Sequence, residues 1–281
     1  MTYRVLGTAS EIEEYFRELE TRKVECIAFD LEGEFNLHQY GEKLCLIQIF
    51  DGRNSLIIDP FAVEPEQIRR VMEDDSVQKV IYDSLGDQAL VQKTLGFKIS
   101  SIIDLRPAAD LLEFERKDLG SVLDAVLGVR IEKKKKFQMY NWTVRPINPE
   151  AMEYALSDVR HLLELKERLL SLLDERGLME EFRLRNLSVQ NRDFSGDRIP
   201  RIFKSGEFLR LSRDRKTLFE KVHSLRDKHA RELNFPPDLV LNKEQMFQLV
   251  SGRIAPEQVR SNRRVPYSAR MRFVSELKRL L

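Results

Sequence analysis

The sequence of 281 residues predicts an α/β protein, in which a mixed sheet is flanked by helices and a small all-α domain follows at the C-terminus. Three observations support this fold class. Three short β-rich runs follow one another between residues 24 and 60, strand and helix patterns then alternate, and helical patterns alone fill the C-terminal third. Three strands followed by strand and helix in alternation imply one sheet covered by helices.

The N-terminal elements follow from apolar spacing. Residues 11–20 should form a helix capped by Ser10, because Ile12, Tyr15, Phe16 and Leu19 recur at helical spacing. The runs VECIAFDLE, KLCLIQIFD and SLIIDP predict a meander of neighbouring strands. We then expect a helix over residues 64–74, a strand at KVIYD and a helix over residues 84–95.

The remaining chain predicts helices and a domain boundary. Residues 106–185 have helical patterns, except in the loop around KKKKFQMYNWTVRPINP. The polar stretch at residues 188–206 lacks periodicity and predicts a linker. We therefore expect a first domain at residues 1–187 and a helical domain at residues 207–281, broken at Pro236-Pro237 and Gly252.

Composition narrows the class of protein. Charged residues make up 33% of the chain, and no apolar run approaches the roughly 18 residues that span a bilayer. Two cysteines are too few for a secreted disulfide framework, and Cys26 and Cys45 lie in apolar runs that suit small buried side chains. The four histidines show no metal-ligand arrangement. We expect a cytoplasmic protein without a membrane partner.

Charge is distributed unevenly between the two expected domains. Residues 1–196 hold 27 Lys and Arg against 36 Asp and Glu, whereas residues 197–281 hold 20 against 10. A basic C-terminal domain suggests a polyanionic partner, although a solvated basic surface is the alternative.

Several acids predict a metal site. Asp30 and Glu32 lie two apart on a strand, so their carboxylates share a face and could hold one cation; a solvated strand end is the alternative. Tyr154 and Asp158 lie four apart and share a helix face. Asp87 lies near a helix start, where the helix dipole alone would favour an acid. Taken singly, Tyr154 also suits a half-buried core position and Asp158 a solvated one.

Together, these groups suit hydrolysis of a phosphodiester by two metal ions about 4 Å apart. Hard oxygen ligands favour Mg²⁺ or Mn²⁺ over zinc.

Three motifs carry a resemblance to a known family. They are FDLE followed by GEKLCLIQI, then KVIYDSLGDQAL, then NWTVRPINPEAMEYALSDVRHLLEL. Over about residues 5–180 the chain resembles the DEDD-type 3′-5′ exonucleases of the tyrosine-containing branch, most closely the ribonuclease D group. The resemblance implies a ribonuclease H-like sheet and a 3′-5′ exonuclease that releases nucleoside 5′-monophosphates.

The resemblance also implies roles for single residues. Asp30, Glu32 and Asp158 would bind two divalent ions, Mg²⁺ or Mn²⁺, with Asp30 bridging both and Asp87 acting at the second site. Tyr154 would position the attacking water. The chain departs from many relatives in having Tyr82 five residues before Asp87. The tripeptide Leu31-Glu32-Gly33 is similar to the sequence at this position in the egalitarian-like branch, some of whose members bind RNA without cutting it.

Residues 207–281 resemble a helicase-and-ribonuclease-D C-terminal (HRDC) domain in the run LFEKVHSLRDKHARELNFPPDLVLNKEQMFQLV. Many ribonuclease D proteins carry two such domains, whereas this chain has room for one. Its expected role is a salt-dependent, sequence-independent grip on phosphates. The segment EKKKKFQMYNW mixes lysines with aromatic residues, as a single-strand surface does, although a solvated loop with inward aromatics is the alternative. The candidate nucleic-acid contacts are Lys136, Gln138, Trp142, Arg145, Arg226, Lys228 and Arg231.

The leading hypothesis is a metal-dependent 3′-5′ exoribonuclease acting on single-stranded RNA 3′ ends, such as those of tRNA precursors. A second hypothesis is an exonuclease for short oligonucleotides or DNA. A third is a non-catalytic RNA-binding adaptor with the same fold.

Overall fold

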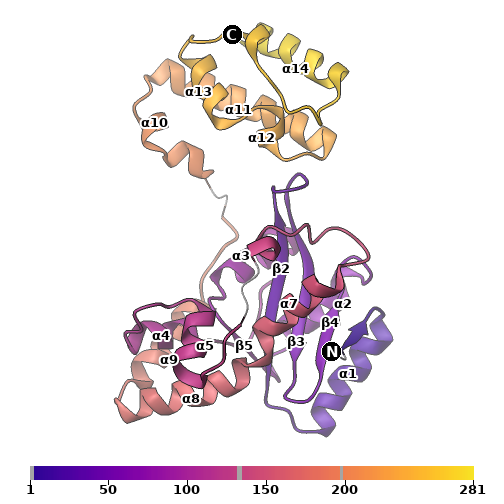
Figure 1. Ribbon diagram of the computed structural model, residues 1–281, viewed down its shortest axis with the longest axis vertical. Helices are drawn as coiled ribbons and strands as arrows, with labels where there is room; N and C mark the ends of the chain where they lie inside the picture. Colours follow the sequence, from indigo (N-terminus) through magenta and orange to yellow (C-terminus); the bar gives the residue numbers. More distant parts are fainter. Residues whose placement is uncertain (1–2, 132–134, 197–198) are drawn as a thin grey trace. The chain divides into compact units, whose positions relative to one another are not determined.

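The computed structural model describes residues 3–131, 135–196 and 199–281. Clustering of contacts divides the chain into two compact units, residues 1–33 with 43–195 and residues 34–42 with 196–281. No helix in the described ranges is long and apolar enough to cross a membrane. Figure 1 shows the elements of both units.

A six-stranded mixed sheet forms the centre of the first unit, in the order β1-β4-β3-β2-β5-β6. The β1–β4, β2–β5 and β5–β6 pairs are parallel, and β3–β4 is antiparallel. The expected meander and the strand-helix alternation are therefore confirmed. The strands are β1 (Arg4–Leu6), β2 (Cys26–Phe35), β3 (Glu42–Phe50), β4 (Ser55–Ile58), β5 (Gln78–Ile81) and β6 (Ile102–Asp104).

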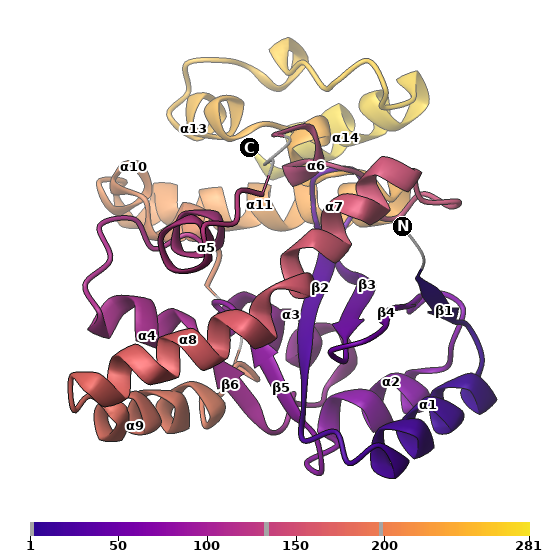
Figure 2. The same cartoon turned by 60° about the horizontal axis from the view of Figure 1, so that its bottom comes forward.

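Helices cover both faces of the sheet. The buried residues of α1, α2 and α3 share one apolar core with strand residues such as Ile27 and Phe29. Helices α4, α5, α8 and α9 form a second core, and α7 packs on Cys45, Leu46 and Ile57. Figure 2 shows α8 and α9 beside β5 and β6. These helices are α1 (Ala9–Thr21), α2 (Pro65–Glu73), α3 (Leu85–Leu95), α4 (Arg106–Leu111), α5 (Leu119–Leu127), α6 (Lys135–Gln138), α7 (Pro149–Arg160), α8 (Leu162–Glu175) and α9 (Met179–Gln190).

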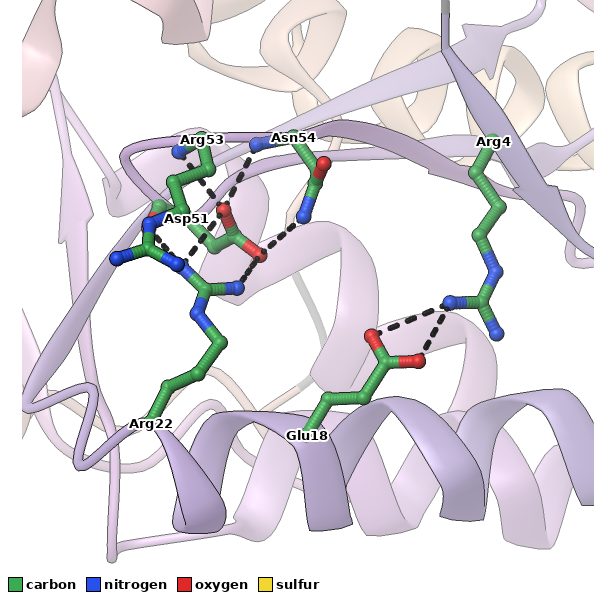
Figure 3. Close-up of polar contacts among 6 residues, drawn as sticks. All are labelled: Arg4, Glu18, Arg22, Asp51, Arg53 and Asn54. Atoms are coloured by element: carbon green, nitrogen blue, oxygen red, sulfur yellow. Dashed lines mark hydrogen bonds and ion pairs between the residues drawn. The ribbon is translucent and has the colours of Figure 1, made fainter.

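Polar contacts fasten the N-terminal elements (Figure 3). Helix α1 begins at Ala9, two residues earlier than expected, because the Thr8 hydroxyl, rather than that of Ser10, accepts the N–H of Glu11. Arg22 at the end of α1 donates to the buried carboxylate of Asp51 at 2.7 Å. Arg4 of β1, a strand that the sequence did not predict, pairs with Glu18 of α1 at 3.0 Å.

Two amide side chains of α9 complete the hydrogen bonding of the edge strand β6. Asn186 Oδ1 accepts the backbone N–H of Asp104 at 2.7 Å, and Asn186 Nδ2 donates to the Asp104 carbonyl. One turn later, Gln190 Oε1 accepts the N–H of Ile102 at 2.7 Å, while its Nε2 donates to the Ile99 carbonyl. Helix α9 therefore occupies the place of a seventh strand along this edge.

The second unit is a helical bundle around Phe208, Phe219, Val222, Met246 and Phe273. Val222 is buried, and Leu218, Leu225 and Leu233 pack against this core. The region expected as a linker, residues 188–206, contains more structure than expected, because α9 extends to Gln190 and η1 packs on the bundle. The elements are η1 (Arg201–Lys204), α10 (Gly206–Leu209), α11 (Arg213–Leu233), α12 (Pro237–Val240), α13 (Lys243–Val250), η2 (Pro256–Gln258) and α14 (Tyr267–Leu280).

We predict that Gln190→Ala and Asn186→Ala each lower the free energy of unfolding by about 1–3 kcal/mol, because each leaves a backbone N–H of β6 without its acceptor. Urea unfolding of the full chain measures this loss. Leu187→Ala, which truncates an exposed side chain on the same helix, is the matched control and should change stability little. A loss no larger than that of Leu187→Ala would contradict the assignment of these amides to the strand edge.

Candidate active site

Three carboxylates from two elements meet at the sheet. One oxygen each from Asp30 and Glu32 of β2 and from Asp158 of α7 all lie within 4.8 Å of one another. Strand alternation explains why Asp30 and Glu32 lie on the same face of β2. The alternate residues Ile27, Phe29 and Leu31 point into the core beneath α1, which leaves the two acids on the opposite face. The pair predicted from the spacing of β2 is therefore joined by the predicted acid of α7.

Helix α7 is placed by its own sequence. It begins at Pro149, and Asn148 caps it by accepting the N–H of Glu150 at 2.8 Å. Ala151, Ala155 and other apolar residues of α7 pack on β3 and β4. The face that remains carries Tyr154 and Asp158, one turn apart, toward the acids of β2.

The third acid of the β2 sequence has a different task. Glu34 is 1% exposed, and its carboxylate accepts the backbone N–H of His38 at 2.9 Å and that of Leu37. The His38 ring also contacts it at 3.1 Å. Glu34 therefore shapes the turn that follows β2.

Asp87 lies in the first turn of α3, outside the group of three acids but close enough for its charge to raise the pKa values of Asp30 and Glu32. The buried Asp104 fixes this helix start. Its carboxylate accepts the N–H of Asp83 at 2.9 Å, and the N–H and hydroxyl of Ser84, each at 2.8 Å. Asp104 is 1% exposed, and these hydrogen bonds give it a positioning role that the sequence did not predict.

Burial and like charge shift the titration of the cluster. Burial, followed by the charges of Asp87, Asp158 and Glu32, raises the pKa of Asp30 well above its usual range. Burial and the charges of Asp158 and Asp87 do the same for the pKa of Glu32. Burial and the neighbouring Asp104 and Asp83 raise the pKa of Asp87 to about 8. The ionised cluster is costly by itself, and a bound cation would remove that cost.

Tyr154 lies beside these acids as a neutral phenol. Burial, then the charges of Asp158, Glu32 and Asp30, raise its pKa. The ring of Phe137 packs on the ring of Tyr154 with centroids 5.5 Å apart. Phe137 is buried and therefore anchors α6 to α7.

The predicted nucleic-acid contacts of the first unit are mostly engaged within the protein. Trp142 is buried, as its packing alternative predicted. Arg145 clamps Asp59 with two bonds of 2.6 and 2.7 Å and also donates to the carbonyls of Cys45 and Trp142. Arg145 is thus a structural residue rather than an exposed phosphate ligand.

Two further candidate nucleic-acid contacts, Lys136 and Gln138, belong to α6. Lys136 is exposed and pairs with Glu150, a contact that a phosphate can replace. The backbone of Gln138 lies in α6, and its side chain lies outside the described set.

The cations expected to grip phosphate on α11 are also paired. Arg226 is buried and bonds Asp238, which corrects its assignment to a phosphate-binding surface. Lys228 pairs with Glu276 at 3.1 Å. Within the second unit, Arg231 donates to the Tyr40 hydroxyl and pairs with Asp227.

Comparisons with known proteins place this geometry in context. A family model described as 3'-5' exonuclease matches residues 3–174. Exosome complex component 10 of Mus musculus is 27% identical over 246 residues, covering 83% of this chain and 27% of that protein. This chain thus spans about a quarter of the length of that curated relative.

Two solved structures show the same fold. The catalytic core of RRP6 from Trypanosoma brucei has a TM-score of 0.80 at 23% identity, covering 99% of this chain and 79% of that one. Escherichia coli RNase D has a TM-score of 0.73 at 19% identity, covering 99% of this chain and 76% of that one.

We predict that the metal-free protein loses stability as the pH rises from about 4 to about 8. The folded-state pKa values of Asp30, Glu32 and Asp87 lie above the unfolded values near 4, so the neutral carboxyls contribute stability that ionisation removes. Thermal unfolding in EDTA across this range measures the slope. The double variant Asp30→Asn, Asp87→Asn should flatten it, and an equal slope in both proteins would contradict the pKa directions.

We also predict that Asp30→Asn stabilises the metal-free protein by about 1–2 kcal/mol, because it removes one of several mutually repelling charges. The same variant should lose most of the stabilisation that Mn²⁺ gives the wild type. Melting temperatures with EDTA and with Mn²⁺ measure both effects. Glu164→Gln, at an exposed position of α8, is the matched control and should behave as wild type.

Proposed function

The chain belongs to the family of 3'-5' exonucleases, and on this premise we propose that it is a divalent-metal-dependent 3′-5′ exoribonuclease. The observation that carries the proposal is the convergence of Asp30, Glu32 and Asp158, whose ligand oxygens lie within 4.8 Å of one another. Tyr154 stands on the same helix face as Asp158. These are the residues that the family resemblance assigns to catalysis.

The donor set fits hard divalent ions. Three converging carboxylates suit Mg²⁺ or Mn²⁺, which prefer oxygen ligands. Asp30, Glu32 and Asp158 would hold one ion, and Asp87 would serve a second with Asp30. When bound, such ions supply a hydroxide near neutral pH and stabilise the leaving oxygen.

The side chains of this chain supply the positioning. The phenol of Tyr154, kept protonated by its raised pKa, suits a hydrogen bond that orients the attacking water rather than removal of a proton. Attack at the last phosphodiester forms a bond from the water oxygen to phosphorus and breaks the bond to the 3′ oxygen, which takes up a proton. The products are a nucleoside 5′-monophosphate and an RNA one nucleotide shorter.

We propose RNA as the substrate because similar proteins are described as acting on RNA. Escherichia coli RNase D, which shares the fold, is described as an exoribonuclease involved in structured RNA processing. We extend the proposal to tRNA precursors in the cytoplasm because the sequence motifs resemble those of the ribonuclease D group. Acids that act on the phosphodiester act on RNA and DNA alike, so the test compares the two substrates directly.

The test is a time course on a 5′-labelled single-stranded RNA and a DNA of the same sequence, with Mg²⁺, Mn²⁺ or EDTA. We expect a ladder of shortening products that requires metal and is faster on RNA. Asp30→Asn should abolish cleavage, and Tyr154→Phe should slow it by about 100-fold, since loss of the correct orientation of a reacting group costs about that much.

Glu164→Gln is the matched control and should cleave as wild type. Retained cleavage by Asp30→Asn would contradict the site. Faster cleavage of DNA than of RNA would make DNA the substrate, and RNA binding without cleavage in either metal would indicate an adaptor.

A further inference from the structure

The second unit has a concentration of arginine that lies outside α11. Residues 253–272 contain six arginines and a single acid, Glu257. They occupy the connection between α13 and α14 and the first half of α14. We call residues 253–270 the arginine segment; its arginines are Arg253, Arg260, Arg263, Arg264 and Arg270.

These arginines differ in their partners from the α11 cations that the sequence assigned to phosphate. Arg253, Arg260, Arg263 and Arg264 are exposed, and none of them forms an ion pair with a residue that the structure describes. By contrast, Lys228 pairs with Glu276, Arg231 with Asp227 and Arg272 with Glu232. The exposed arginines of the segment therefore have no acidic partner among the described residues, whereas Lys228 and Arg231, where the sequence had placed the phosphate grip, are paired.

The backbone of the segment is held in place. Asn262 N–H donates to the Leu239 carbonyl at 2.8 Å, and the Ser261 hydroxyl donates to the Val240 carbonyl at 2.7 Å. Gln245 of α13 bonds both the N–H and the carbonyl of Arg260. Val265 is buried, so the arginines project from an ordered scaffold that would lose little conformational entropy on binding.

An exposed aromatic ring adjoins the arginines. Tyr267, the first residue of α14, is 71% exposed, and Arg270 lies over its ring at 5.9 Å. Met271, one turn later, is also exposed. Arg264 lies over the ring of Phe235 at 5.5 Å, which directs its stem along the bundle. Guanidinium groups beside an open aromatic ring match a phosphate backbone with an unstacked base.

We propose that the arginine segment binds single-stranded RNA, with Arg260, Arg263 and Arg264 on successive phosphates and Tyr267 stacking on a base. The proposal rests on the proposed function for the identity of the RNA, and it assigns the grip to residues different from those expected on α11. Arginine binds phosphate oxygens through two parallel hydrogen bonds, which favours a phosphate chain over a diffuse anionic surface.

Binding of a fluorescent single-stranded RNA to the full chain in EDTA tests the proposal, because no cleavage occurs and failure of the nuclease assignment cannot affect the result. We compare Arg260→Gln, Arg263→Gln, Arg264→Gln with the matched triple Lys228→Gln, Arg231→Gln, Arg272→Gln. Both triples lower the net charge by three, but only the first removes unpaired cations. Melting temperature and circular dichroism establish that each variant is folded, and the double variant Arg260→Gln, Arg263→Gln replaces the triple if it is not.

We expect the segment triple to weaken binding at least tenfold at 0.1 M salt and to reduce the slope of log affinity against log salt by about 2, since each lost phosphate contact on a single strand contributes about 0.7. The matched triple should change the slope by less than half as much. Equal effects, or a larger effect of the matched triple, would overturn the proposal.

Stacking is tested separately. Tyr267→Ala should weaken binding about tenfold without changing the salt slope, and Tyr267→Phe should retain affinity, because stacking uses the ring and not the hydroxyl. Unchanged affinity in Tyr267→Ala would overturn the stacking assignment. Tighter binding of the wild type to phosphatidylserine vesicles than to RNA, lost in the segment triple, would overturn RNA as the ligand.

Discussion

Repulsion among half-buried carboxylates is the constraint that the first unit is built to withstand. Asp30, Glu32 and Asp158 approach one another from β2 and α7, and the charge of Asp158 helps to raise the pKa values of Asp30 and Glu32. Such a group survives only where the surrounding packing holds it. The apolar face of α7 on β3 and β4 supplies one part of that packing, and the hydrogen bonds of Asp104 at the start of α3 supply another. Because repulsion among these acids destabilises the metal-free protein, it also favours binding of a cation at this site.

Much of this unit was predictable because its signals are local. Alternating apolar residues predicted β2, β3 and β4, and helical spacing predicted α1, α2 and α3. The four acids and Tyr154 followed from motifs. The strand β1 was missed because three residues carry almost no periodicity and form a strand only through pairing with β4. The cap of α1 moved from Ser10 to Thr8 because neighbouring hydroxyls compete and geometry selects between them.

Charged and aromatic residues were harder to assign than the acids of the site. A sequence shows that an arginine is present but not which acid or carbonyl group it pairs with in the folded protein. Arg145 and Arg226 resembled phosphate ligands until the structure paired them with Asp59 and Asp238. Trp142 resembled a stacking platform and proved to be core. The distinction depends on partners distant in sequence, such as the 86 residues between Asp59 and Arg145, which no local pattern encodes.

The amide pairing of α9 with β6 also bears on the behaviour of the protein in a crowded solution. An uncovered edge strand offers its N–H and C=O groups to the edge of another molecule, and such contacts propagate into aggregates. Asn186 and Gln190 occupy these groups from within the same chain. Helix α9 thereby protects β6 from intermolecular strand addition with two polar side chains. The sheet needs no charged residue or proline to block pairing at this edge.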